Sequence, residues 1–230
     1  MSHIIDITDP NYIAYCSVHH PNGRGHYNGA YYYSKEIVKN IIPNVQTSRP
    51  WDTLGMKFLR TNDHAILFIH HNLNHEKVYR WLRDYKDLVL VCATPITLEW
   101  AKTLTKSHAV YLPLSVDVEY VRQFKTKKTK DTCYMGNRWS FKRKYEDKLP
   151  NDVDFPPQNL PREELLKWIA PYRKVYAIGR CAVEAKILGA EILPFYPIFP
   201  DPNYWKILDN KDAAKILQEQ LDEIDKLKTP

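Results

Sequence analysis

The sequence predicts an α/β protein with two small units, each built around a parallel β-sheet. Short apolar runs alternate with amphipathic stretches, the rhythm of strands and helices that follow one another in such a sheet. A lysine-dense run at residues 122–131 (RQFKTKKTKD) interrupts the rhythm, and all nine histidines fall at or before His108. We therefore expect an N-terminal domain over residues 1–117 and a C-terminal domain over residues 118–230.

The N-terminal half is expected to alternate strands with helices. Apolar runs predict buried strands, and amphipathic periodicity predicts the helices between them. The strands are expected at 11–18, 64–69, 88–93 and 109–114, and the helices at 30–42, 76–85 and 95–104. A polar loop at 19–29, which contains Gly23 and Gly25, joins the first strand to the first helix. This order is typical of a Rossmann-like sheet.

The C-terminal half repeats the rhythm after the lysine run, which we interpret as a linker or exposed turn. Strands are expected at 132–135, 174–178 and 191–195, and helices at 162–169, 181–188 and 211–227. A proline-rich loop at 155–161 precedes the first of these helices. The last helix has apolar residues at helical spacing, which predicts one buried face.

The strongest candidate site is the stretch VYAIGRCAVEAKILG at residues 175–189, where a strand runs into Gly179 and a helix follows at once. Such a turn presents backbone N–H groups and the positive end of a helix dipole to an anion. Arg180 adds a planar fork for phosphate oxygens, and Glu184, one turn further, can accept hydrogen bonds from ribose hydroxyls. The alternative is an ordinary Arg–Glu pair on a helix surface.

A second candidate is YMGNRWSFKRK at residues 134–144. The strand is expected to end at Gly136, and Arg138 follows on a loop with Lys142 or Arg143. Two cations at this spacing can embrace a diphosphate and stabilise the charge that builds on it as it leaves. A basic, solvated turn is the alternative.

These motifs, in this order, resemble the C-terminal domain of the family 4 retaining glycosyltransferases, which have the two-domain GT-B fold. The stretch VYLPLSVD at 110–117 is similar to the family's linker signature, with Ser115 where the family usually has glycine. The resemblance covers roughly residues 88–221. It implies two Rossmann-like domains facing a central cleft, with the acceptor domain first and the nucleotide-sugar domain second.

The resemblance also implies roles for single residues. Arg138 and Lys142 match the basic pair at the donor diphosphate, and Arg143 competes with Lys142 because the family's usual spacing is five. Glu184 matches the second glutamate of the E-x7-E motif, which binds the nucleotide ribose, and Tyr176 stands where the first glutamate is expected. Gly179 matches a motif glycine, whereas Arg180 departs from the motif.

Histidines follow two of the expected strands. His70 and His71 come after the strand at 64–69, and His19 and His20 come after the first strand. Open α/β sheets place their sites at carboxyl strand ends, and the resemblance implies a functional histidine there that faces the transferred sugar. The glycine loop with Gly23 and Gly25 would let donor and acceptor approach the backbone. Structural histidines and an ordinary turn are the alternatives.

No metal site is expected. His71 and His75 have the spacing of zinc ligands on a helix, but neither an HExxH arrangement nor a cysteine partner accompanies them. The chain also has no P-loop or nucleophile-elbow motif. Basic side chains would stabilise the leaving group instead, so no cofactor is expected beyond the sugar donor.

The sequence therefore predicts a metal-independent glycosyltransferase that moves a sugar from a nucleotide sugar, by resemblance UDP-glucose or a similar UDP-sugar, to a hydroxyl. The alternative is a non-catalytic nucleotide or nucleic-acid binding module on the same fold. A net charge of +6 and a pI near 9.0 favour an anionic partner under either interpretation.

The setting is expected to be the cytoplasm. The sequence shows no signal peptide and no apolar run near the roughly 20 residues that span a bilayer, and its four dispersed cysteines suit reduced thiols. At 230 residues the chain is short for this class of enzyme, which suits a viral genome, such as a phage's, and the host cytoplasm. DNA with a hydroxylated base would then be one expected acceptor, with the lysines of 125–130 as phosphate contacts.

Overall fold

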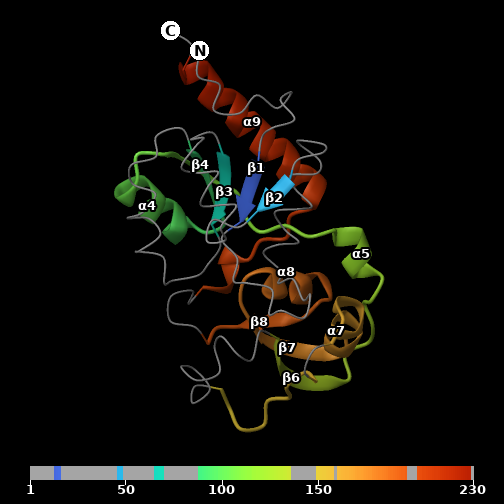
Figure 1. Cartoon of the computed structure of the whole chain (residues 1–230). Helices are drawn as coiled ribbons and strands as arrows, with labels where there is room; N and C mark the ends of the chain where they lie inside the picture. Colours follow the sequence, from blue (N-terminus) through green and yellow to red (C-terminus); the bar gives the residue numbers. More distant parts are fainter. Residues whose placement is uncertain are drawn as a thin grey trace. The chain divides into compact units, whose positions relative to one another are not determined.

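A computed structural model shows a mixed α/β protein with two parallel sheets (Figure 1). The structure describes residues 13–16, 46–48, 65–69, 88–135, 149–157, 160–195 and 201–228. The chain divides into two compact units. The first takes the described residues up to Pro113 together with those from Asn210 onward, and the second takes Leu114–Asp209. Parallel sheets joined by helices are consistent with a Rossmann-like architecture.

The first unit contains a five-stranded sheet in the order β2-β1-β3-β4-β5. The strands are β1 (Ile13–Cys16), β2 (Gln46–Ser48), β3 (Ala65–Ile69), β4 (Leu88–Cys92) and β5 (His108–Tyr111), and every neighbouring pair is parallel. Four of these strands confirm predicted ones, and β2 was not expected. Because β2 and β3 flank β1, the winding of the sheet changes direction between β1 and β3, where parallel α/β sheets place ligands.

Strand β4 is buried, and a helix follows it almost directly. Val89, Leu90 and Val91 are at most 1% exposed, as expected for a parallel strand covered on both faces. Helix α4 (Pro95–Leu104) has the predicted bounds. Its N-cap is Thr94, whose hydroxyl accepts a hydrogen bond from the Thr97 N–H. The Thr97 hydroxyl in turn accepts one from the Thr94 N–H, and both bonds are 3.1 Å long. This capping box fixes where the helix starts.

Helix α9 (Asn210–Lys228) belongs to the first unit, although it comes last in the sequence. Its apolar face is buried, as the helical spacing predicts, through Ala213, Ala214, Leu217, Leu221 and Ile224. The Gln220 side chain donates a hydrogen bond to the backbone oxygen of Tyr111 at the end of β5, at 3.1 Å. The predicted helices at 30–42 and 76–85 lie outside the described residues.

The second unit contains a three-stranded parallel sheet in the order β6-β7-β8. Its elements are α5 (Val118–Arg122), β6 (Lys130–Met135), α7 (Arg162–Ile169), β7 (Tyr172–Ala177), α8 (Arg180–Ile187), β8 (Glu191–Leu193) and a 3-10 turn, η2 (Pro202–Tyr204). The three strands and both longer helices confirm predicted elements. Helix α5 and η2 were not expected, and the turn predicted for 122–131 is confined to residues 123–129, because α5 ends and β6 begins within it.

Two carboxylates explain where the short helix α5 begins. Asp117 Oδ1 accepts a hydrogen bond from the Tyr120 N–H at 2.9 Å, and Asp209 Oδ2 accepts one from the Val118 N–H at 3.1 Å. Val116 also pairs with Asp209 in a parallel bridge. Asp117 of the VYLPLSVD stretch therefore acts as a helix cap.

The lysine run lies at the C-terminal ends of α7 and α8. Lys128 Nζ donates to the Ala170 backbone oxygen at 2.9 Å, and burial lowers the pKa of Lys128. A β-carbon built on Gly189, just after α8, would lie 3.5 Å from Lys125 Cε. Cations at this end of a helix complement its dipole, so Lys125 and Lys128 both have a structural explanation.

Candidate anion-binding site

The turn between β7 and α8 requires a glycine at position 179. Gly179 is the N-cap of α8 with φ 65° and ψ −143°, a combination that residues with a β-carbon essentially never adopt. Glycine has no side chain that could cap the first N–H groups of this helix. The predicted order of strand, Gly179 and helix is confirmed, and the helix begins at Arg180.

Arg180 and Glu184 form an ion pair within α8. Arg180 Nε donates to Glu184 Oε1 at 3.2 Å, and both side chains are only 6% exposed. The pair that the spacing predicts is therefore present, but it is buried rather than on the surface. Taking two charges out of water is expensive, so this pair needs an explanation that an exposed pair would not.

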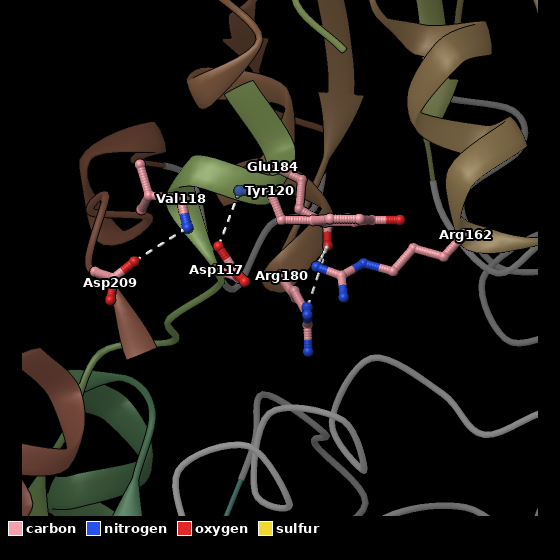
Figure 2. A network of polar contacts seen from close by, with 7 residues as sticks. All are labelled: Asp117, Val118, Tyr120, Arg162, Arg180, Glu184 and Asp209. Atoms are coloured by element: carbon pink, nitrogen blue, oxygen red, sulfur yellow. Dashed lines mark hydrogen bonds and ion pairs between the residues drawn. The ribbon is translucent and has the colours of Figure 1, made fainter. Parts of the chain in front are cut away.

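A third charged residue, Arg162, joins this pair from the first position of α7. Its Nη2 lies 3.1 Å from the same Glu184 oxygen, and its side chain is 30% exposed. The guanidinium carbon of Arg162 also lies 5.2 Å from the centre of the Tyr120 ring on α5, a cation–π contact. Figure 2 shows that Arg162 approaches Glu184 from the side opposite Asp117 and Asp209, the two residues that cap α5. We define Arg162, Arg180 and Glu184 as the arginine cluster.

Both arginines of the cluster are the first residue of a helix. The N-terminus of a helix carries positive partial charge, so a cation there is unfavourable unless a negative group offsets it. Glu184 is such a group for both Arg162 and Arg180. In this unit the two arginines of the cluster lie at helix N-termini, whereas Lys125 and Lys128 lie at helix C-termini. The first arrangement opposes the helix dipoles and suits the binding of an anion.

The cluster lies at the carboxyl edge of the β6-β7-β8 sheet. Met135 and Ala177, the last residues of β6 and β7, are partners in the strand register. The chain therefore leaves both strands at the same edge, and the predicted second candidate site begins directly after Met135 at Gly136. Parallel α/β sheets bind their ligands at this edge.

The other predicted site residues lie outside the described residues: His19, His20, Gly23, Gly25, His70, His71, Gly136, Arg138, Lys142 and Arg143. The strands that precede the two histidine pairs, β1 and β3, are described, however. Cys16 of β1 and Phe68 of β3 are register partners, so the segments that carry the two histidine pairs leave neighbouring strands at one edge. The topology is thus compatible with either pair as the predicted functional histidine.

Tyr176, which stands at the position of the family's first glutamate, belongs to an aromatic cluster. It is the register partner of Tyr134, and both rings contact Phe195 edge-to-face, at 6.3 Å for Tyr176 and 5.5 Å for Tyr134. Phe155 lies 5.6 Å from Tyr134. Tyr176 is therefore a packing residue on the face of this sheet.

Cys181 follows Arg180 directly, but little of its thiol is in the reactive thiolate form. Burial, with the Glu184 carboxylate nearby, raises the pKa of its thiol to about 12, and burial raises the pKa of Cys92 and Cys133 to about 12 as well, from 9.0. A pKa higher by about three means roughly a thousandfold less thiolate at pH 8, and the thiolate is the reactive form.

We therefore expect Cys92, Cys133 and Cys181 to react with iodoacetamide at pH 8 about a thousandfold more slowly than free cysteine. Mass spectrometry of the native protein after timed labelling measures this rate. The guanidinium-denatured protein, which should label at all four cysteines, is the control. Rapid labelling of native Cys181 would contradict this account of its surroundings and reopen a thiol chemistry at the site.

Two further searches cover the described part of the chain. No group of three or more histidine, cysteine, aspartate or glutamate side chains is arranged there to hold a metal ion. None of the helices in those residues is both long enough and apolar enough to cross a membrane.

Comparison with known proteins does not assign a family. No protein-family description and no curated protein matches the sequence. Among solved structures, the chain is similar to one described as the crystal structure of GsuK bound to ADP, at 12% sequence identity and a TM-score of 0.30. That alignment covers 96% of this chain and 71% of the other. A likeness at this TM-score supports no inference about fold or ligand.

Proposed function

We propose that the chain is a glycosyltransferase of the GT-B type that transfers a sugar from a nucleotide sugar, such as UDP-glucose, to a hydroxyl. The observation that supports it best is the arginine cluster at the β7–α8 turn. Two arginines at helix N-termini, one of them directly after the positive-φ Gly179, suit the diphosphate of a nucleotide. The two parallel-sheet units would be the acceptor and donor halves.

In this proposal the chain's own side chains handle the leaving diphosphate. Arg180 and Arg162 would bind its oxygens, and Arg138 with Lys142 or Arg143 would join them from the segment after β6. Fixed cations stabilise the negative charge that develops as the sugar–oxygen bond breaks. His70 or His71, with His19 and His20 as competitors, would face the sugar. DNA with a hydroxylated base is the proposed acceptor, which the basic chain suits.

A second candidate function is a binding module that holds a nucleotide or nucleic acid without transfer. One observation favours it: Tyr176, at the position of the family's first glutamate, packs on Phe195. The carboxylate that the resemblance would place against the donor sugar is therefore replaced by a packing residue. Binding would remain while the contact to the sugar is lost.

A thermal-shift screen of nucleotide sugars, followed by an assay of UDP release, tests the proposal. We expect UDP-glucose or a related donor to raise the Tm of the wild type, and slow release of UDP from that donor. Arg180→Ala should need at least about tenfold more donor to reach the same rise in Tm, since a charge-assisted hydrogen bond is lost. Arg122→Ala, at an exposed arginine on α5, is the matched control and should behave as wild type.

The outcomes separate the two candidates. Donor stabilisation that survives Arg180→Ala unchanged would contradict the site. Stabilisation by UDP without any turnover, across several donors and acceptors, would favour the binding module over the transferase.

A further inference from the structure

Helix α5 is tied to both places where the chain passes between its two units. The chain enters the second unit at Leu114 and leaves it after Asp209, and we call these the two passages. Val116 and Asp209 pair in a parallel bridge, and the Val116 N–H donates to the Leu208 backbone oxygen at 3.1 Å. Asp209 Oδ2 also accepts a hydrogen bond from the N–H of Val118, the first residue of α5, at 3.1 Å. The paired passages and the start of α5 therefore share Asp209.

The same helix contacts the arginine cluster. Tyr120 is the third residue of α5, and its ring centre lies 5.2 Å from the guanidinium carbon of Arg162. Arg162 Nη2 lies 3.1 Å from Glu184 Oε1. Figure 2 shows the start of α5 between Asp209 on one side and Glu184 with Arg162 on the other. One short helix thus joins the two passages to the charged residues of α7 and α8.

A helix as short as α5 depends on its contacts. It has five residues, and a helix of that length does not persist on its own. Val118 and Val121 are buried and anchor it to the unit, while Asp117 and Asp209 accept hydrogen bonds from N–H groups of its first turn. The equilibrium between a formed and a loosened first turn therefore depends on these caps. Because Tyr120 belongs to that turn, loosening it withdraws the ring from Arg162.

We propose that α5 couples the two passages to the arginine cluster, with Asp209 as a positioning residue that acts on Arg162 through the Tyr120 ring. While the first turn of α5 is formed, the ring holds the Arg162 guanidinium beside Glu184. When the pairing of the passages changes, Asp209 moves, the turn loosens and that support is lost. Residues in one contact network are energetically coupled, and the coupling acts in both directions. It is independent of the proposed function.

Hydrogen exchange and NMR of the 15N-labelled full chain test the coupling from the Asp209 end. The Val121 N–H donates to the Asp117 backbone oxygen rather than to Asp209. We expect Asp209→Ala to speed exchange at Val121 about fivefold and to shift the Arg162 Nε–H resonance. Asp209→Asn keeps an acceptor oxygen and should stay close to the wild type. Thr94→Ala removes an N-cap from α4 in the first unit and should change neither signal.

A second variant measures the coupling from the Tyr120 end, and it decides the matter even if Asp209→Ala does not fold. Tyr120→Leu removes the ring from Arg162, and we expect exchange at Val118, whose N–H donates to Asp209, to become about two- to fivefold faster. Leucine has the higher helix propensity, so propensity alone would slow this exchange. Tyr120→Phe keeps the ring and should exchange as the wild type does.

Four results would overturn the coupling. A folded Asp209→Ala protein with wild-type signals at Val121 and Arg162 would make Asp209 a local cap only. Wild-type exchange at Val118 in Tyr120→Leu would show that the ring contact transmits nothing. An equal shift at Arg162 when Asp209→Ala is added to Tyr120→Leu would mean that the effect bypasses the ring. The same changes in Thr94→Ala would attribute them to general destabilisation.

Discussion

Gly179→Ala is expected to lower the free energy of unfolding by about 1–3 kcal/mol, because alanine cannot adopt this backbone conformation without strain. Gly179 has φ 65° and ψ −143° at the start of α8. The strain is relieved only if the turn between β7 and α8 changes, and such a change moves Arg180. We therefore also expect UDP to bind at least about tenfold more weakly. Chemical denaturation and isothermal titration measure the two effects.

Gly189→Ala is the matched control at the other end of α8. Gly189 also has positive φ, 84°, and an added β-carbon would meet Lys125 Cε at 3.5 Å, an ordinary contact. This variant should lose about 1 kcal/mol of stability and keep the wild-type affinity for UDP. Equal loss of UDP affinity in both variants would mean that general destabilisation, rather than the Gly179 turn, explains the result.

Glu184→Leu is expected to be the most destabilising single substitution in the arginine cluster, by about 3 kcal/mol. It removes the carboxylate from Arg180, whose side chain is 6% exposed, and from Arg162. The double variant Arg180→Met with Glu184→Leu replaces the buried pair by apolar side chains and should be more stable than Glu184→Leu alone. Denaturant unfolding of the four species in a double-mutant cycle measures the coupling.

The exposed pair of Arg122 and Glu119 on α5 provides the reference cycle. Its side chains are 59% and 77% exposed, and such pairs contribute between about 0 and 1 kcal/mol. We expect Arg122→Met and Glu119→Leu to change stability little, alone or together. A coupling in the arginine cluster no larger than in this reference pair would show that burial adds nothing there.

The backbone of the candidate site could be predicted from sequence because its signal is local. An apolar strand that ends at a glycine, in a chain with few glycines, predicts both the turn at Gly179 and the start of α8. The positive φ of Gly179 is the physical reason for that signal. The pairing of Arg180 with Glu184 follows from helical spacing in the same way.

The third member of the cluster could not be predicted, because its contact depends on packing. Arg162 reaches Glu184 from another helix, and no spacing rule links residues so far apart. One local signal was available: an arginine at the first position of α7, directly before Glu163 and Glu164, where acidic residues are favoured. An unfavourable charge at a helix end can indicate a binding site.

Elements that depend on partners were also missed. Strand β2 is three residues of polar sequence (QTS) at the edge of its sheet, so it has no apolar pattern to indicate it. Helix α5 is five residues long, and one of its caps comes from Asp209, 91 residues away. Such short elements are formed by tertiary contacts rather than by their own propensity.

The arginine and lysine positions together change how the chain's positive charge is interpreted. The sequence shows an excess of cations but not which of them have structural partners. Lys128 binds a helix carbonyl and Lys130 Nζ lies 5.0 Å from the Tyr172 ring centre, so two lysines of the 125–130 run contribute to the fold. The arginines at the N-termini of α7 and α8 oppose the helix dipoles, which favours an anion at those termini.

The most direct test of the central claim, that a nucleotide diphosphate binds at the β7–α8 turn, is an NMR titration of the 15N-labelled chain with UDP. We predict that the largest amide shifts occur from Gly179 to Glu184 and at Arg162, because their N–H groups lie at the two helix N-termini. Largest shifts within the first unit, or no shifts at saturating UDP, would contradict the claim.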